Sequence, residues 1–257
     1  MPVLRLLTAS LLLLTAAAPA SDDAARLRAE TLADTALAPS ERVATYQRYD
    51  FGPLWTKTDN TLVYGFIGPD YQRLRLKLLT VRRDPAAPRR YLVTGKSMVQ
   101  GVVCAFTGEL LLRQVREWKV VPRGLDNEPS PARRAGVALL DYELRETPGQ
   151  PGAGTFQGVA RTRWYVDRHD QLRYYDVDNY SDSFRNNEFV GTWTSRRSGT
   201  VKRCHWGDYR VPFAPGLDIG AGGFSPADAY VHRDWQDVRA GWDQGGAAAA
   251  KQRPWWR

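Results

Sequence analysis

The sequence predicts an all-β protein, an antiparallel β-barrel as first choice and a β-sandwich as second, preceded by a short helix. Apolar and polar residues alternate with a period of two over most of the chain after Thr61. The composition is rich in strand-forming aromatics, with 12 Tyr, nine Trp and eight Phe. Short connections separate the alternating segments, and barrels and sandwiches are the two arrangements that bury one face of such strands.

The first 20 residues have the three-part order of a secretory signal peptide. Arg5 precedes an apolar run that ends at Leu14, and small residues follow up to Ala18-Pro19-Ala20. The run is too short to cross a bilayer, and no later segment is apolar for long enough. We therefore expect an exported protein, periplasmic or extracellular, without a transmembrane segment.

Residues 21–46 form the predicted helical segment. Ala and Leu recur at helical spacing between charged residues, and the pattern ends near Pro39. This helix could cover one end of the barrel or lead into it. Residues 47–240 form the predicted β domain, and the Gly- and Ala-rich residues 241–257 a flexible tail.

The predicted strands follow one another through turn-forming residues. Gln100-Gly101 separates two alternating segments and predicts a tight hairpin, and Gly199 lies in the short loop between residues 189–194 and 201–206. Proline- and glycine-rich breaks elsewhere are expected to be loops. The inward faces are predicted to carry Leu74, Leu76, Leu78, Cys104, Phe106, Leu110, Leu112, Ala138, Leu140, Tyr142, Leu144, Phe156, Trp164, Phe189 and Trp193.

Cys104 and Cys204 are the only cysteines in the chain. In an oxidising compartment, an even and minimal count favours one disulfide. A bridge closing a loop of this length would stabilise the fold by about 4–5 kcal/mol. Two buried free thiols are the alternative.

Sequence motifs give little support for catalysis. Cys204 and His205 are adjacent, but neighbours on a strand point to opposite faces, so this histidine cannot activate this thiol. The three histidines lack zinc-ligand spacing, and neither a nucleophile elbow nor a phosphate-binding glycine loop is present. We expect no metal and no cofactor.

Asp176 and Asp178 are the only candidate catalytic residues. They would share one strand face, and two carboxylates can hydrolyse glycosidic bonds or contribute to a calcium site. The spacing departs from a calcium-binding loop, and Asp is common in polar turns. A turn is the favoured interpretation.

The net charge of +8 and the interleaving of Arg with aromatic residues suit anionic partners. Single-stranded nucleic acid or a glycan could stack on such aromatic side chains. In an exported protein the combination suits glycans equally well, and alternation by itself places aromatics inside and arginines outside, so we do not expect nucleic acid as a partner. A solvated outer wall is the simplest interpretation.

The chain resembles known proteins in two respects. The stretches VYGFIGPDYQRLRLKL, YLVTGKSMVQGVVCAFTG and NNEFVGTWTSRRSGTVKRCHWGDYRVPF resemble a family of exported bacterial proteins of unassigned function. Gly191-Thr192-Trp193 is similar to the Gly-x-Trp motif of calycins, the lipocalin and avidin group of ligand-holding barrels. In lipocalins the motif lies on the first strand, whereas here it comes late; the resemblance implies a barrel end closed by Trp193.

These observations predict a non-catalytic barrel that binds a small apolar or aromatic molecule. Its expected binding residues are Trp164, Trp193, Phe106 and Tyr142, because bulky aromatics could line the barrel interior or mouth. A structural surface protein with a filled core and a glycan-acting enzyme using Asp176 and Asp178 are the alternatives. The sequence does not indicate an oligomeric state.

Overall fold

A computed structural model describes residues 22–243 and 254–257, so the predicted signal peptide lies outside the described residues. The helices are α1 (Asp22–Ala33), α2 (Val43–Tyr46), α3 (Asp228–Val231) and α4 (Gln236–Asp243), with short 3₁₀ turns η1 (Gly52–Trp55), η2 (Asn60–Leu62) and η3 (Leu125–Asn127). The strands are β1 (Val63–Ile67), β2 (Gln72–Asp84), β3 (Ala87–Val99), β4 (Val102–Glu117), β5 (Ala132–Glu146), β6 (Gly154–Asp167), β7 (Leu172–Tyr174), β8 (Asn186–Ser195) and β9 (Val201–Asp208).

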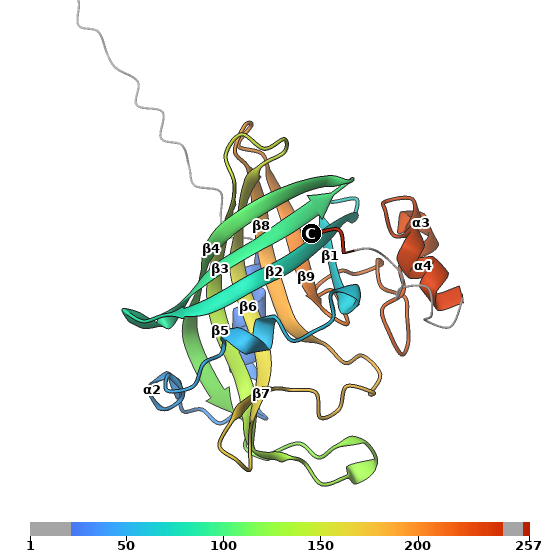
Figure 1. The fold of residues 1–257 in the computed structure, drawn as a ribbon. Coiled ribbons are helices and arrows are strands. Elements are labelled where there is room, and N and C mark those ends of the chain that lie inside the picture. The colour runs from blue at the N-terminus through green and yellow to red at the C-terminus, as the bar shows by residue number, and fades with distance from the viewer. Residues whose placement is uncertain (1–21, 244–253) are drawn as a thin grey trace, which may run out of the picture.

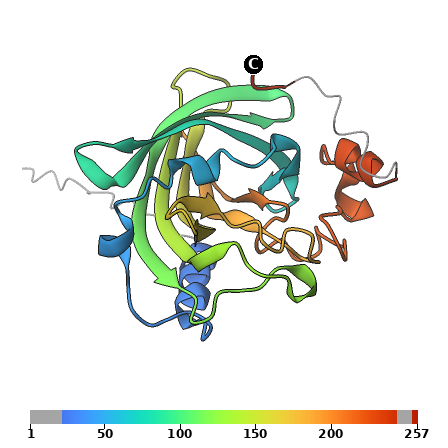
Figure 2. The same cartoon turned by 60° about the horizontal axis from the view of Figure 1, so that its bottom comes forward.

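The strands form one antiparallel sheet that closes on itself as a ring (Figures 1 and 2). The order is β5-β4-β3-β2-β1-β9-β8-β6, and pairing of β6 with β5 completes the circle. The short β7 adds to β6 outside this circuit. Closure removes exposed sheet edges, which would otherwise present unpaired backbone groups.

Alternation along each strand places one set of side chains inside the ring, as the sequence predicts. Leu74, Leu76 and Leu78 of β2 are buried in the core, and so are the inward residues of β4. Register shifts lie between Leu78 and Thr80 in β2 and between Leu112 and Gln114 in β4. Each shift changes the phase of the alternation, since an extra residue moves the next side chain to the other face.

Hairpin turns agree with the sequence. Gln100 and Gly101 both adopt positive φ, 49° and 78°, as the tightest two-residue hairpins require. Strand β8 ends at Ser195 and β9 begins at Val201, with Gly199 at φ 69° in the loop between them.

One end of the ring is closed by aromatic side chains. Tyr46 of α2 packs against Trp164 with ring centroids 4.5 Å apart, and Phe51 contacts the same indole edge-on. Trp55 of η1 donates from Nε1 to Thr162 Oγ1 at 2.7 Å. The segment that follows α1 therefore closes this end, which we call the closed end.

The outer wall is covered in two places. Helix α1 lays Ala24 and Leu27 on the outer face of β5, β6 and β8, against Leu139, Val159 and Val190. The helix ends at Ala33, earlier than the predicted end near Pro39, and the chain turns there. Residues 211–238 cover the outer face of β1 through a second apolar cluster that includes Phe66, Leu217 and Trp235.

These covers change the outer face that alternation predicts. Val190 and His205 point outward, opposite to the core residues, yet both are fully buried. Their burial does not follow from the sequence pattern, because alternation gives the face of a residue and not what packs on that face.

Within the described ranges, no helix is long and apolar enough to cross a membrane. The predicted tail is described only at residues 241–243, which end α4, and at 254–257. Trp256 there lies beneath the Lys77 ammonium of β2, 5.3 Å from ring centroid to Nζ.

Candidate functional site

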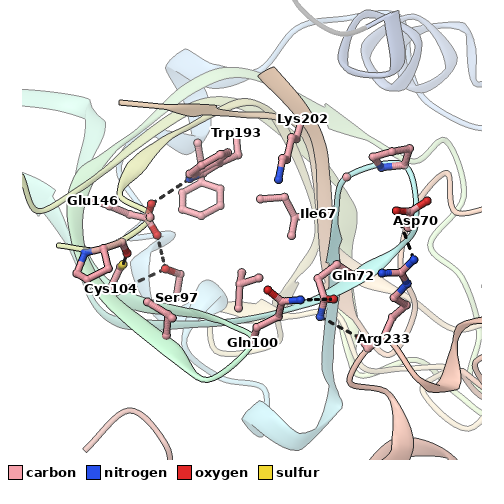
Figure 3. Close-up of a pocket in the computed structure, with 17 residues that line it drawn as sticks. Ile67, Asp70, Gln72, Ser97, Gln100, Cys104, Glu146, Trp193, Lys202 and Arg233 are labelled. Carbon is pink, nitrogen blue, oxygen red and sulfur yellow. Dashed lines mark hydrogen bonds and ion pairs between the residues drawn. The ribbon is translucent and has the colours of Figure 1, made fainter. Parts of the chain in front are cut away.

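A pocket of about 420 Å³ opens at the end of the ring opposite the closed end, which we call the mouth. The β1–β2, β3–β4, β5–β6 and β8–β9 connections all lie here. Figure 3 shows the side chains around this opening. The pocket is lined by Ile67, Gly68, Pro69, Asp70, Gln72, Ser97, Val99, Gln100, Val102, Cys104, Glu146, Pro151, Gly152, Phe156, Trp193, Lys202 and Arg233.

The wall and the floor of the pocket are largely apolar. Ile67, Val99 and Trp193 come from three different strands, and Phe156 lies among them. Beneath Phe156, the rings of Phe189 and Trp206 stack at 4.6 Å and 10°. Phe156 approaches Trp206 edge-on at 6.1 Å, so aromatic packing separates the pocket from the rest of the core.

Glu146 is a buried carboxylate that holds the indole of Trp193. Its Oε2 accepts a hydrogen bond from Trp193 Nε1 at 2.9 Å, and its Oε1 accepts from Ser97 Oγ (Figure 3). Oε2 also accepts from the Gly154 amide at 2.7 Å. Only 3% of Glu146 is exposed. Three donors offset the cost of burying this group, and they fix the Trp193 ring at the pocket wall.

Lys202 lies directly opposite Trp193 in the β8–β9 register. It has the same parity as Cys204 and Trp206, so its side chain belongs to the inward face at the rim (Figure 3). Its Nζ is 5.8 Å from the Trp193 ring centroid. Among the described residues, no carboxylate oxygen lies within 4 Å of this ammonium.

The other polar groups at the mouth are paired with one another. Gln100 donates from Nε2 to Gln72 Oε1 at 3.2 Å, and Arg233 forms an ion pair with Asp70 at 3.5 Å. Arg233 follows α3, so the segment that covers β1 also contributes to the pocket rim.

The two cysteines are free thiols, which corrects the predicted Cys104–Cys204 disulfide. They lie on β4 and β9, four strands apart in either direction around the ring. At about 4.8 Å per strand, a ring of eight strands has a circumference of about 38 Å and a diameter of at least about 12 Å, whereas a disulfide needs Cα atoms within about 7 Å. Both side chains point inward, but from opposite walls.

The thiols are poor nucleophiles. Burial raises the pKa of Cys204 well above its usual value and also raises that of Cys104. Cys104 lines the pocket, with Sγ 3.4 Å from the Pro151 carbonyl oxygen, to which it donates. Cys204 and His205 point to opposite sides of β9, as expected from strand geometry.

The residues expected to bind a ligand lie at different depths. Trp193 lines the pocket, at one rim of the ring rather than at the aromatic closed end. Phe106 and Tyr142 belong to the packed core below the pocket. Trp164 lies eight residues beyond Phe156, about 26 Å farther along β6, inside the closed end.

Asp176 and Asp178 do not line the pocket. Both follow β7 near the closed end, where Lys57 lies 3.7 Å from Asp176 and Arg163 lies 3.2 Å from Asp178. The backbone carbonyl oxygen of Asp178 also accepts a hydrogen bond from Ser181 Oγ at 2.6 Å, as in a polar turn. Each carboxylate therefore has a cationic partner.

Sequence patterning did not single out Glu146 and Lys202. A signal was present, because Glu146 continues the inward series of Tyr142 and Leu144, and Lys202 precedes Cys204 by two residues. A charged residue in an inward position is an exception to binary patterning, and such exceptions mark candidate sites.

A second buried carboxyl lies toward the closed end. Asp208 Oδ2 accepts hydrogen bonds from Thr58 Oγ1 at 2.6 Å, Asn187 Nδ2 at 2.7 Å and Tyr174 OH at 3.0 Å. Burial raises the pKa of Asp208 to about 7, although these donors act in the opposite direction.

His205 connects α1 to the outer wall. Its Nδ1 lies 3.1 Å from the Pro212 carbonyl oxygen and its Nε2 lies 3.5 Å from Asp23, which also pairs with Arg203 at 2.8 Å. Burial lowers the pKa of His205 to about 4, so the imidazole is neutral at pH 7. Over the part of the chain that the structure covers, no group of His, Cys, Asp and Glu is arranged to hold a metal ion.

No protein-family model, curated protein or solved structure matches this chain. Its function is therefore inferred from the pocket and the side chains around it.

Proposed function

We propose that this protein is an exported, calycin-like β-barrel that binds a small apolar or aromatic molecule in its mouth pocket. The observation that carries the proposal is a pocket of about 420 Å³ whose wall includes an indole held by a buried carboxylate. Ligand sites are typically concave and apolar, of about 300–1,000 Å³, with a few placed polar groups.

The order of the wall supports binding rather than a simple packing defect. In a cavity that is only a packing defect, no hydrogen bonds are needed to fix the side chains of the wall. Here Glu146 is buried with three hydrogen-bond donors, one of which is the indole of the wall residue Trp193. Fixing a ring before the ligand arrives reduces the entropy lost on binding. The aromatic layer below the pocket limits the site to the mouth, so a bound molecule would enter between the hairpins.

The experiment fills the pocket and measures binding of a neutral aromatic probe, N-phenyl-1-naphthylamine, by its fluorescence increase. Val99→Trp places a large side chain among the lining residues, while Leu92→Trp on the same strand adds a large side chain to the exposed outer face. We expect wild type and Leu92→Trp to bind alike and Val99→Trp to bind at least tenfold more weakly.

The alternatives predict different results. A structural protein with a filled core predicts no binding to the wild type. Probe binding that is unaffected by Val99→Trp would also overturn the proposal. Asp176→Asn should leave probe binding unchanged, and loss of turnover on a glycan in that variant would support the enzyme alternative. Mass spectrometry of protein purified without reduction would reveal a retained ligand.

A further inference from the structure

We propose that the ligand of the mouth pocket is an amphipathic anion whose charged group pairs with the Lys202 ammonium. This inference depends on the proposed function and specifies its ligand: an apolar or aromatic body in the pocket and a carboxylate, sulfonate or phosphate at the rim.

The two charged side chains on the inward face of the mouth differ in how far their polar atoms are already bonded within the protein. Glu146 and Lys202 are its charged residues on strands, one at the end of β5 and the other at the start of β9. The carboxylate of Glu146 already accepts from Ser97, Gly154 and Trp193. Within the described ranges, the ammonium of Lys202 has no carboxylate within 4 Å, so the cation is the charged group of the two that is still open to a partner from a ligand.

The position of Lys202 fits an anchor for the charged end of a ligand. Cross-strand pairing puts it beside Trp193, and its Nζ is 5.8 Å from the indole centroid. In Figure 3 its side chain extends along the opening between Trp193 and Ile67. A molecule stacked on the indole would therefore have its outer end near the ammonium. Lys202 is exposed, so its ammonium is accessible to a molecule that enters the mouth.

The neighbouring rim increases the positive potential. A second hollow, of about 850 Å³, adjoins the pocket between the β5–β6 and β8–β9 connections, and Trp193 and Lys202 line both. Arg196 and Arg197 line this hollow as well. No carboxylate of the described residues lies within 4 Å of either guanidinium. Three cations at one side of the opening would attract an anion and orient it.

A cationic ligand fits less well. It would have to pair with Glu146, which is 3% exposed and occupied by three donors, or with Asp70, which pairs with Arg233. Displacing those donors would leave buried N–H and O–H groups unsatisfied. The pocket volume exceeds that of the roughly 150 Å³ cavities that hold one benzene ring, so it can accept a larger body.

The experiment compares two probes with the same ring system, neutral N-phenyl-1-naphthylamine and anionic 8-anilinonaphthalene-1-sulfonate. Their dissociation constants are measured for wild type, Lys202→Met, Lys202→Arg and the control Lys96→Met, which removes an outward-facing lysine of β3. We expect Lys202→Met to weaken the anionic probe at least fivefold and the neutral probe less than twofold. Lys202→Arg should keep the affinity for the anion, and Lys96→Met should match the wild type.

The outcomes separate the two proposals. If neither probe binds to the wild type, the proposed function fails and the inference fails with it. If both bind but Lys202→Met weakens them equally or not at all, the anionic anchor is refuted while the binding function stands.

Competition then identifies the source of the anionic group. Sodium decanoate offers a free carboxylate, and phosphatidylglycerol vesicles, compared with phosphatidylcholine vesicles, offer a lipid headgroup. Displacement of the bound sulfonate by decanoate supports a free acid, and displacement by the anionic vesicles alone supports a lipid. Failure of both anions to compete would overturn the proposed ligand class.

Discussion

Replacing Asp208 by asparagine isolates the cost of keeping a carboxyl group inside the ring. The pKa of Asp208 is raised by burial to about 7, from 3.8 for an unburied aspartate. Between these values the unfolded chain is ionised at this residue while the folded protein keeps the proton. Stability from this group is thus fully present below pH 3.8 and is lost as the pH rises to about 7.

The shift of about three pH units corresponds to at most about 4 kcal/mol, at 1.36 kcal/mol for each unit. Asparagine preserves a carbonyl oxygen that can accept from Thr58, Asn187 and Tyr174, and it does not ionise. Relative to wild type, Asp208→Asn should therefore gain stability progressively between about pH 4 and pH 7.

The measurement is urea unfolding followed by tryptophan fluorescence at pH 4, 5, 6, 7 and 8, with the free energy of unfolding compared at each pH. The control is Asp228→Asn, whose side chain is 84% exposed, so its difference from wild type should change little. A difference between Asp208→Asn and wild type that stays constant from pH 4 to pH 8 would refute the reasoning.

Four further predictions concern the core, the outer wall and the mouth. The pKa of His205 is lowered to about 4 in the folded protein, from 6.5 in the unfolded chain. The stability that neutral His205 supports is therefore complete above pH 6.5 and falls by at most about 3 kcal/mol as the pH drops to about 4. His205→Gln should remove this loss in the same urea experiment. Glu146→Gln replaces one accepting carboxylate oxygen by an NH2 group, which faces donors that it cannot bond. The free energy of unfolding in urea should fall by about 1–3 kcal/mol, and the neutral probe should bind more weakly. Gly191→Ala would place a Cβ 2.0 Å from the Gln157 carbonyl oxygen and 2.6 Å from the Tyr142 hydroxyl. We expect thermal unfolding to show a free energy of unfolding lower by about 1–3 kcal/mol or more, and an unchanged midpoint would contradict this packing. Iodoacetamide added to denatured, unreduced protein should modify two thiols by mass spectrometry, and a mass without adducts would indicate a disulfide instead.

The interior of the ring was readable from the sequence because it depends on a local property. Successive side chains of a strand alternate between faces, so Leu74, Leu76 and Leu78 indicate their common face by spacing alone. The Gln100-Gly101 turn is local in the same sense, since its two positive φ angles favour these residue types. The opposition of Cys204 and His205 follows from the same alternation.

The candidate site was less predictable because it joins distant segments. Glu146 and Trp193 are 47 positions apart and meet only because β5 and β8 both pair with β6. Neither residue type nor spacing shows that one donates to the other. The disulfide prediction failed for a related reason, because compartment and cysteine count say nothing about the four strands that separate the two thiols.

The sequence by itself determined the strand character of the chain, its turns and the face on which most side chains lie, since each follows from neighbouring residues. The tertiary structure decided which strands meet, that β6 closes the ring on β5, and that α1 and residues 211–238 cover parts of the outer wall. It also decided that Glu146, Trp193 and Lys202 share one opening. These features arise from contacts between residues far apart in the chain, and such contacts are selected by the packing of the whole molecule rather than by any local pattern.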